Sequence, residues 1–193
     1  MKKKTFVLLL ALVLIAGAAV GGTLAWLTDT TEAVQNTFTT SDIDITLAET
    51  KGGTDKEFKM IPGCTIEKDP KVTVKAGSEK CYLFVKIAKS DNFSSFMTYT
   101  VADGWTQLKD ASDNDVPGVY YRVVDTTEMG TPYSVLKDDQ VTVKGEVTKA
   151  MMNGLTTTTY PTLTFTAYAS QFSKNNTDSF TAAEAWKNVN PTT

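Results

Sequence analysis

Short runs in which apolar and polar residues alternate recur along most of this chain. In residues 42–47, Ile43, Ile45 and Leu47 alternate with two aspartates and a threonine. An alternation with period two is typical of a strand that buries one face. Further runs of this kind, or of β-rich composition, cover residues 71–75, 82–87, 119–124, 141–147 and 163–168. The pattern predicts a chain built mainly of strands.

Turn-forming residues separate these runs. Short segments that contain glycine or proline occur at 52–53, 62–63, 76–77, 117–118 and 130–132. Many short strands that are separated by turn residues indicate an antiparallel β-sandwich rather than alternating β and α units. The turn at 76–77 predicts that the strands on either side of it pair. Asp103-Gly104, a favoured two-residue turn, predicts a hairpin between 98–102 and 105–108. We expect an all-β, jelly-roll-like sandwich.

Helices are predicted only as short accessories. Thr148 is placed to cap a turn that contains Met151, Met152 and Leu155. Thr181 and Glu184 form a capping-box sequence, which predicts a last helix that runs to about residue 188. We expect Trp186 to dock this helix on the sandwich.

The first 25 residues have the composition of an export signal. Three lysines at 2–4 precede the apolar run 6–20, and small residues lead to Ala25. Cleavage after Ala25 leaves Trp26 as the mature N-terminus. The alternative is an uncleaved membrane anchor, since 6–27 is apolar and long enough to span a bilayer. We predict a signal helix at 1–25, an arm at 26–40 and a sandwich domain at 41–193.

Several segments of the chain resemble one family of exported proteins. The matching residues are Gly21, Gly22, Thr23, Ala25, Trp26, Asp29, Asn36, Phe38, the strand 42–45, and segments 61–87, 160–171 and 182–186. In these residues the chain is similar to the TasA/camelysin family of Gram-positive bacteria, and to its small clostridial members. The resemblance covers most of the chain. It implies processing by a SipW-type signal peptidase, secretion to the cell surface or biofilm matrix, and a β-sandwich that joins fibres.

The arm is the segment for which the resemblance implies a role. Fibres of this family are thought to grow by donor strands, and an extended arm can pair with a neighbour's sheet edge. Val34 and Phe38 lie on one face of such a strand, and Trp26 and Leu27 form an apolar end. The alternative is that the arm forms the first strand of its own sandwich. We expect the partners to be copies of this chain or related fibre subunits.

Composition argues against several other functions. The 193 residues contain no histidine and one arginine, Arg122, and loss of the signal shifts the formal charge from −3 to −6. The missing histidine excludes Ser-His-Asp machinery and the usual histidine zinc sites, so the peptidase activity described for camelysins is not carried over. An acidic chain without clustered basic residues is a poor nucleic-acid binder. We expect no enzyme, cofactor, metal site or nucleic-acid partner, and no membrane contact after cleavage.

The sequence leaves open whether Cys64 and Cys81 form a disulfide or remain reduced thiols. Export would permit a disulfide between them. If residues 76–79 form a tight turn, however, Cys81 faces Val74 and Cys64 lies far along the other strand. The Cα atoms of bonded cysteines must approach to about 7 Å. This register favours two reduced, partly buried thiols.

Three other groups of residues have a functional and a structural interpretation. Asp42 and Asp44 are spaced like paired carboxylates, but they fit the solvent face of a strand. The acidic stretch 110–115 resembles a calcium loop but lacks its glycine and distal glutamate, which favours a solvated turn. A third group could line a sugar-binding face, or pack in the core: Trp105, Tyr120, Tyr121, Tyr160, Phe165 and Tyr168. A carbohydrate- or host-surface-binding module is therefore the alternative function, and a metallopeptidase is the less favoured one.

Overall fold

The computed structural model describes residues 42–50 and 58–190, which belong to one compact unit. The predicted signal and the predicted arm lie outside the described residues. The strands are β1 Ile45–Ala48, β2 Thr65–Glu67, β3 Lys71–Val74, β4 Cys81–Lys89, β5 Met97–Thr98, β6 Thr106–Lys109, β7 Asp115–Val124, β8 Pro132–Ser134, β9 Gln140–Val143 and β10 Leu163–Gln171. The helices are α2 Phe93–Phe96, α3 Lys149–Asn153 and α4 Ala182–Val189, with 3-10 turns η1 Thr126–Glu128 and η2 Lys137–Asp139. The fold is mostly β, as predicted.

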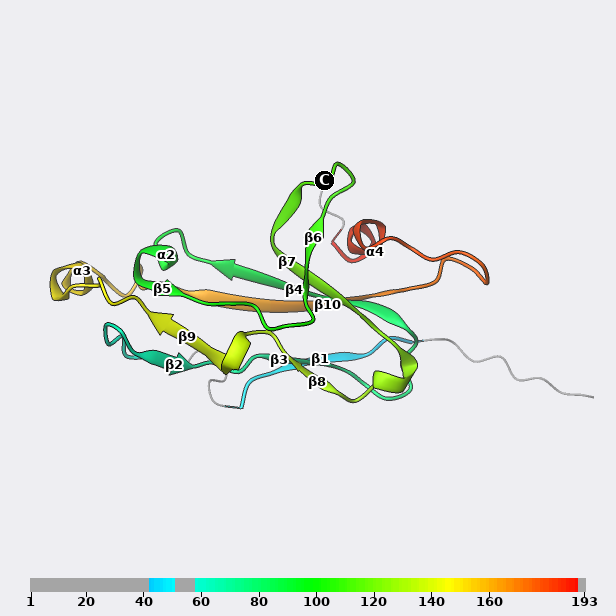
Figure 1. The fold of residues 1–193 in the computed structure, drawn as a ribbon, viewed down its shortest axis with the longest axis horizontal. Helices are drawn as coiled ribbons and strands as arrows, with labels where there is room; N and C mark the ends of the chain where they lie inside the picture. The colour runs from blue at the N-terminus through cyan, green and yellow to red at the C-terminus, as the bar shows by residue number, and fades with distance from the viewer. Residues whose placement is uncertain (1–41, 51–57, 191–193) are drawn as a thin grey trace, which may run out of the picture. The chain divides into compact units, whose positions relative to one another are not determined.

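The strands form three antiparallel sheets (Figure 1). The β4 sheet has the order β10-β4-β7-β6, the β3 sheet has the order β1-β3-β8, and the β9 sheet has the order β2-β9-β5. Within the described residues, no helix is long and apolar enough to cross a membrane.

The β3 and β9 sheets are joined by continuous chain and by backbone hydrogen bonds. β2 leads into β3, and β8 leads into β9. The N–H of Lys68 donates to the carbonyl of Asp139 at 2.8 Å, and the N–H of Val135 donates to that of Pro70 at 2.9 Å. Pro70 has no N–H to donate to a ladder. The register between the two chains of this pair therefore changes at Pro70, between the β2–β9 pairing and the β3–β8 pairing. The two sheets therefore share one long pair of strands.

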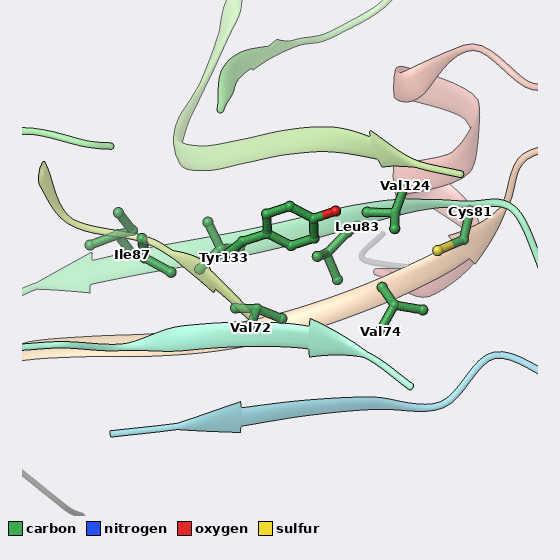
Figure 2. Packing of buried hydrophobic residues seen from close by; sticks show 9 residues of the cluster. Val72, Val74, Cys81, Leu83, Ile87, Val124 and Tyr133 are labelled. Atoms are coloured by element: carbon green, nitrogen blue, oxygen red, sulfur yellow. The ribbon is translucent and has the colours of Figure 1, made fainter. Parts of the chain in front are cut away.

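The main core lies between the β3 sheet and one face of the β4 sheet. Val72 and Val74 of β3 point toward Cys81 and Leu83 of β4, and Val124 of β7 joins them (Figure 2). All five are fully buried. Burying an aliphatic side chain of this size contributes about 1.5–3 kcal/mol, so this contact holds the layers together.

The other face of the β4 sheet carries a second, aromatic core. Phe84 of β4 packs against Trp186 of α4, with ring centroids 5.2 Å apart, and Tyr168 of β10 meets Trp186 edge to face at 5.1 Å. Thr181 caps α4 by accepting from the N–H of Glu184, and the Glu184 carboxylate accepts in return from the N–H of Thr181. The predicted capping box and the docking of Trp186 are confirmed.

Three predictions about strand ends and pairing were wrong. Residues 98–102 and 105–108 do not form a hairpin, because β5 pairs with β9 whereas β6 pairs with β7. The strands flanking residues 76–77 do not pair either: β3 pairs with β1 and β8, and β4 with β10 and β7. The strand predicted at 141–147 ends at Val143, since the N–H of Val147 closes a turn on the carbonyl of Lys144.

Candidate functional site: the outer edge of β10

β10 is the longest edge strand among the described residues. It has nine residues, whereas the edge strands β1, β2, β5, β6 and β8 have four, three, two, four and three. An edge strand presents unpaired N–H and C=O groups that can template pairing with another chain. β10 therefore offers the longest row of such groups.

The sequence of β10 contains none of the usual devices that block an edge. Natural edges are protected by charged residues, proline, bulges or short length. β6 carries Lys109 and a shift in register after Gln107, and β8 begins with Pro132. β10 has no charged residue, proline or glycine. Its ladder with β4 is unbroken from Leu163 to Gln171.

The register with β4 shows which backbone groups face outward. The N–H of Ser90 donates to the carbonyl of Thr162, and the N–H of Phe172 donates to that of Lys80, both at 3.1 Å. Both pairs continue the β4–β10 register, so even-numbered residues of β10 are bonded to β4. The residues that direct their backbone groups to the outer edge are Leu163, Phe165, Ala167, Ala169 and Gln171. Within the described part of the chain, no backbone hydrogen bond forms along this edge.

The side chains along the edge are apolar and partly buried. Leu163, Phe165, Ala167 and Ala169 pack against the main core. β1 passes close to β10, but it pairs with β3. A strand added to this edge would therefore meet an apolar face of the main core.

The arm residues Trp26, Leu27, Val34 and Phe38 and the cleavage site at Ala25 and Trp26 lie outside the described residues. Their proposed roles stay predictions.

Cys64 and Cys81 are free thiols in this structure. Cys81 begins β4 and is fully buried, whereas Cys64 is exposed in the turn before β2. Cys64 thus precedes a strand of the β9 sheet, whereas Cys81 belongs to the β4 sheet. Burial raises the pKa of the Cys81 thiol from 9.0 to about 11.

The acidic candidates have structural partners. Asp44 is exposed and forms an ion pair with Lys75 at 2.6 Å. No group of three His, Cys, Asp or Glu side chains within residues 42–50 and 58–190 is arranged to hold a metal ion. Asp42 and Asp44 are both exposed, and they lie just before β1 rather than within it.

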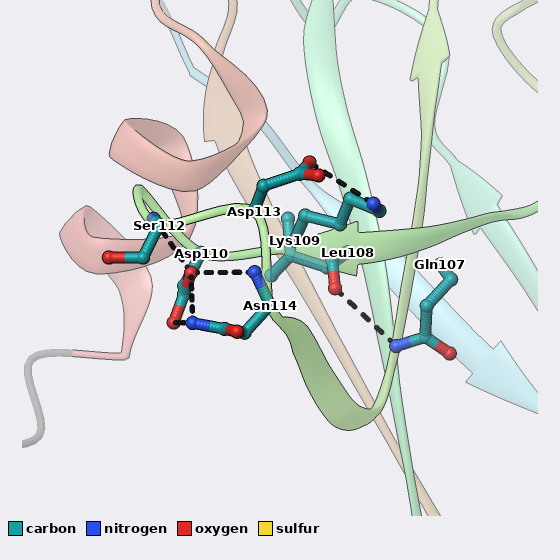
Figure 3. Close-up of polar contacts among 7 residues, drawn as sticks. All are labelled: Gln107, Leu108, Lys109, Asp110, Ser112, Asp113 and Asn114. Carbon is teal, nitrogen blue, oxygen red and sulfur yellow. Dashed lines mark hydrogen bonds and ion pairs between the residues drawn. The ribbon is translucent and has the colours of Figure 1, made fainter.

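The loop 110–114 is closed by its own side chains (Figure 3). The N–H groups of Asn114 and Ser112 donate to Asp110 Oδ1 at 3.0 and 2.8 Å. These two bonds lower the pKa of the Asp110 carboxyl. Asp113 pairs with Lys109 at 3.1 Å. The loop has the hydrogen bonds of a solvated turn.

The six aromatic candidates do not form one binding face. Trp105, Tyr120 and Phe165 pack on the main core, whereas Tyr121 and Tyr168 pack on the opposite face of the β4 sheet. Tyr160 is exposed in a loop. Alternation alone could not separate these positions, because both faces of this sheet are covered.

One partly buried cation was missed by sequence reasoning. The Cζ of Arg122 lies 3.6 Å from the ring centroid of Tyr133 and 5.5 Å from that of Trp105. The Arg122 Nε and the Tyr133 hydroxyl are buried and have no hydrogen-bond partner among the described residues. The lone arginine of the chain was the only sequence signal for this stack. Cation–π contact stabilises the side of the main core between β7 and β8.

Comparison with known proteins finds no matching family model, no matching curated protein and no matching solved structure.

Proposed function

We propose that this protein is an exported, non-catalytic fibre subunit of a cell surface or biofilm matrix. Its arm, residues 26–40, pairs with the outer edge of β10 on the next copy. The observation that carries the proposal is the nine-residue edge of β10, whose outward backbone groups are unpaired within the described residues.

The strand pairing supports a jelly-roll sandwich as the acceptor fold. Counting β2 with β3 and β8 with β9 as single strands gives eight strands in chain order. The second strand (β2 with β3) then pairs with the seventh (β8 with β9), which also pairs with the fourth (β5). The third strand (β4) pairs with the eighth (β10) and with the sixth (β7). A jelly roll of two nested Greek keys has these four pairings.

The outer edge of β10 is where a jelly roll has its first strand. Here β1 pairs with β3 instead. The arm ends at residue 40, shortly before β1 begins at Ile45, and the segment 34–38 carries Val34 and Phe38 on one face with polar residues between them. A strand of this pattern can match the ladder of β10 and place both apolar side chains on the main core.

Donation from one copy to the next leads to a fibre. A contact between an arm and a different surface on its partner is heterologous, and it propagates as a filament when the rotation does not close. If the arm instead folds back on its own β10, the protein is a monomer. Donation between copies is distinguished from an arm that folds back on its own β10 by testing whether the arm of one copy can pair with the β10 edge of another copy.

Ala167→Pro tests the edge, because it removes an outward N–H and keeps the bonds to β4. Ala167→Ser is the matched control, since it retains the N–H. We expect Ala167→Pro to abolish filaments and Ala167→Ser to leave them. Urea unfolding verifies that both variants fold.

A complementation experiment tests donation between copies. A chain that lacks residues 26–38 retains the edge, and the Ala167→Pro chain retains the arm. Native mass spectrometry of the mixture should show one-to-one pairs, and neither variant alone should show pairs. Mixtures that stay monomeric would argue that the arm completes its own sandwich.

A further inference from the structure

An open cleft lies where α2 and β5 meet the β4 sheet. Its volume is about 300 Å³, and it is lined by Lys89, Phe93, Ser94, Met97, Thr98, Tyr99, Tyr120 and Lys144. Its residues come from four parts of the chain: the end of β4, α2 with β5, the middle of β7 and the residue after β9. None of these residues belongs to the β10 edge.

Among the described residues, the lining carries two positive charges and no carboxylate. Lys89 ends β4, and Lys144 follows β9, so the two lysines come from different sheets. Two lysines that line one cleft create a local positive potential that attracts an anion.

Both lysines can bind a ligand. Lys89 Nζ contacts the Ser94 hydroxyl at 3.0 Å, which places the ammonium beside a second donor. Lys144 Nζ lies 3.8 Å from a carboxylate oxygen of Glu146, whose side chain is 70% exposed. An exposed pair at this distance contributes little, so an anion in the cleft can compete for Lys144.

The remaining lining suits a ligand with hydroxyl groups. Ser94, Thr98, Tyr99 and Tyr120 carry hydroxyls, each of which can donate and accept. The Tyr99 ring packs edge-on against Phe93, with centroids 5.9 Å apart, so its orientation is held. The cleft thus combines charged donors, neutral hydroxyls and an apolar wall.

We infer that this cleft binds the oxyanion of a sugar or polyol unit, either a phosphate or a carboxylate. Lys89 and Lys144 bind the oxyanion by charge-assisted hydrogen bonds, and the hydroxyls bind the neutral part of the ligand. Glycopolymers that carry phosphate and those that carry uronate are the two sources of this chemistry. This activity goes beyond fibre assembly and does not depend on it.

The test is an NMR titration of the purified protein with glycerol phosphate, with glucuronate and with neutral glucose. We expect one or both anions to cause saturable shifts of the amides of Thr98, Tyr99, Tyr120 and Lys144, which added salt weakens. Saturation by only one anion identifies the source. Glucose should cause no saturable shift.

Charge-removing variants locate the site. Lys89→Gln and Lys144→Gln should each weaken anion binding about tenfold, because each removes one charge-assisted contact. Lys86→Gln is the matched control: Lys86 is exposed on the same strand and does not line the cleft, so affinity should stay within about twofold. The backbone spectrum of each variant verifies its fold.

Two results would overturn the inference. One is the absence of saturable shifts with either anion. The other is an equal loss of binding in Lys86→Gln, which would mean that the anion responds only to net charge. Neither result bears on the β10 edge, because the chain without residues 26–38 retains the cleft and can be titrated in the same way.

Discussion

Gly118 of β7 lies directly against the carbonyl oxygen of Ile87 on β4. A Cβ on Gly118 would stand 2.3 Å from that oxygen, and the φ of Gly118 is +70°. Both features require glycine, since side chains disfavour positive φ and carbon cannot approach oxygen so closely. The close approach occurs just beyond the last pair of the β4–β7 ladder, Lys86 with Val119.

Gly118→Ala should therefore destabilise the protein by at least about 2 kcal/mol, as strain and steric clash add. Gly63→Ala is the matched control. Gly63 has a φ of +78°, but no atom of the described residues lies within 4 Å of the position that a Cβ would take there, so only the backbone cost of about 1 kcal/mol remains. Urea unfolding of the two variants measures the difference, and equal losses would contradict the account.

The two thiols should differ in reactivity. Cys64 is exposed, whereas Cys81 is buried with its pKa raised to about 11, so its nucleophilic thiolate is scarce at neutral pH. A thiol reagent should label one cysteine per native chain, at Cys64, and both after unfolding without reductant. Absence of labelling in the unfolded, unreduced chain would instead reveal a disulfide.

α4 should respond to acid through Glu184. The Lys174 ammonium and the Thr181 donors lower the pKa of Glu184 from 4.5 to about 2. A carboxyl whose pKa falls on folding stabilises the native state above pH 4.5, and this contribution disappears as the pH falls through about 2. The Tm of the native chain should exceed that of Glu184→Gln above pH 4.5, and the difference should shrink toward pH 2. A difference that stays constant over this range would refute the assignment.

Arg122 should not be replaceable by lysine. Its planar guanidinium stacks on Tyr133 and contacts Trp105, which an ammonium cannot reproduce. Arg122→Lys should cost about 1 kcal/mol in unfolding free energy. Lys109→Arg, at an exposed position, is the control and should be close to neutral. Unchanged stability in Arg122→Lys would show that the stack does not contribute.

Local features of this fold could be predicted from sequence. Alternation identified the strands around Val72, Leu83 and Phe165, and capping residues identified the helices after Thr148 and Thr181. Each of these signals depends on neighbours within a few residues, such as a hydroxyl that caps an N–H in the next turn. Short-range patterns are enough to define single elements.

Pairing could not be predicted in the same way. The turn at Asp103-Gly104 forms, and Gly104 has a φ of +86°, yet the strands on either side join different sheets. Partner choice depends on contacts between residues far apart in the chain. For the same reason, alternation at residues 163–168 predicted a strand without indicating that it lies at an edge. That β10 has an edge without a partner among the described residues became visible only from the sheet order and its register with β4.

The most direct test of strand donation is negative-stain electron microscopy of two chains, one beginning at Trp26 and one at Thr39. We expect filaments from the first chain and only monomers from the second, because the second has no strand to donate. Filaments from both chains, or from neither, would contradict assembly through the arm.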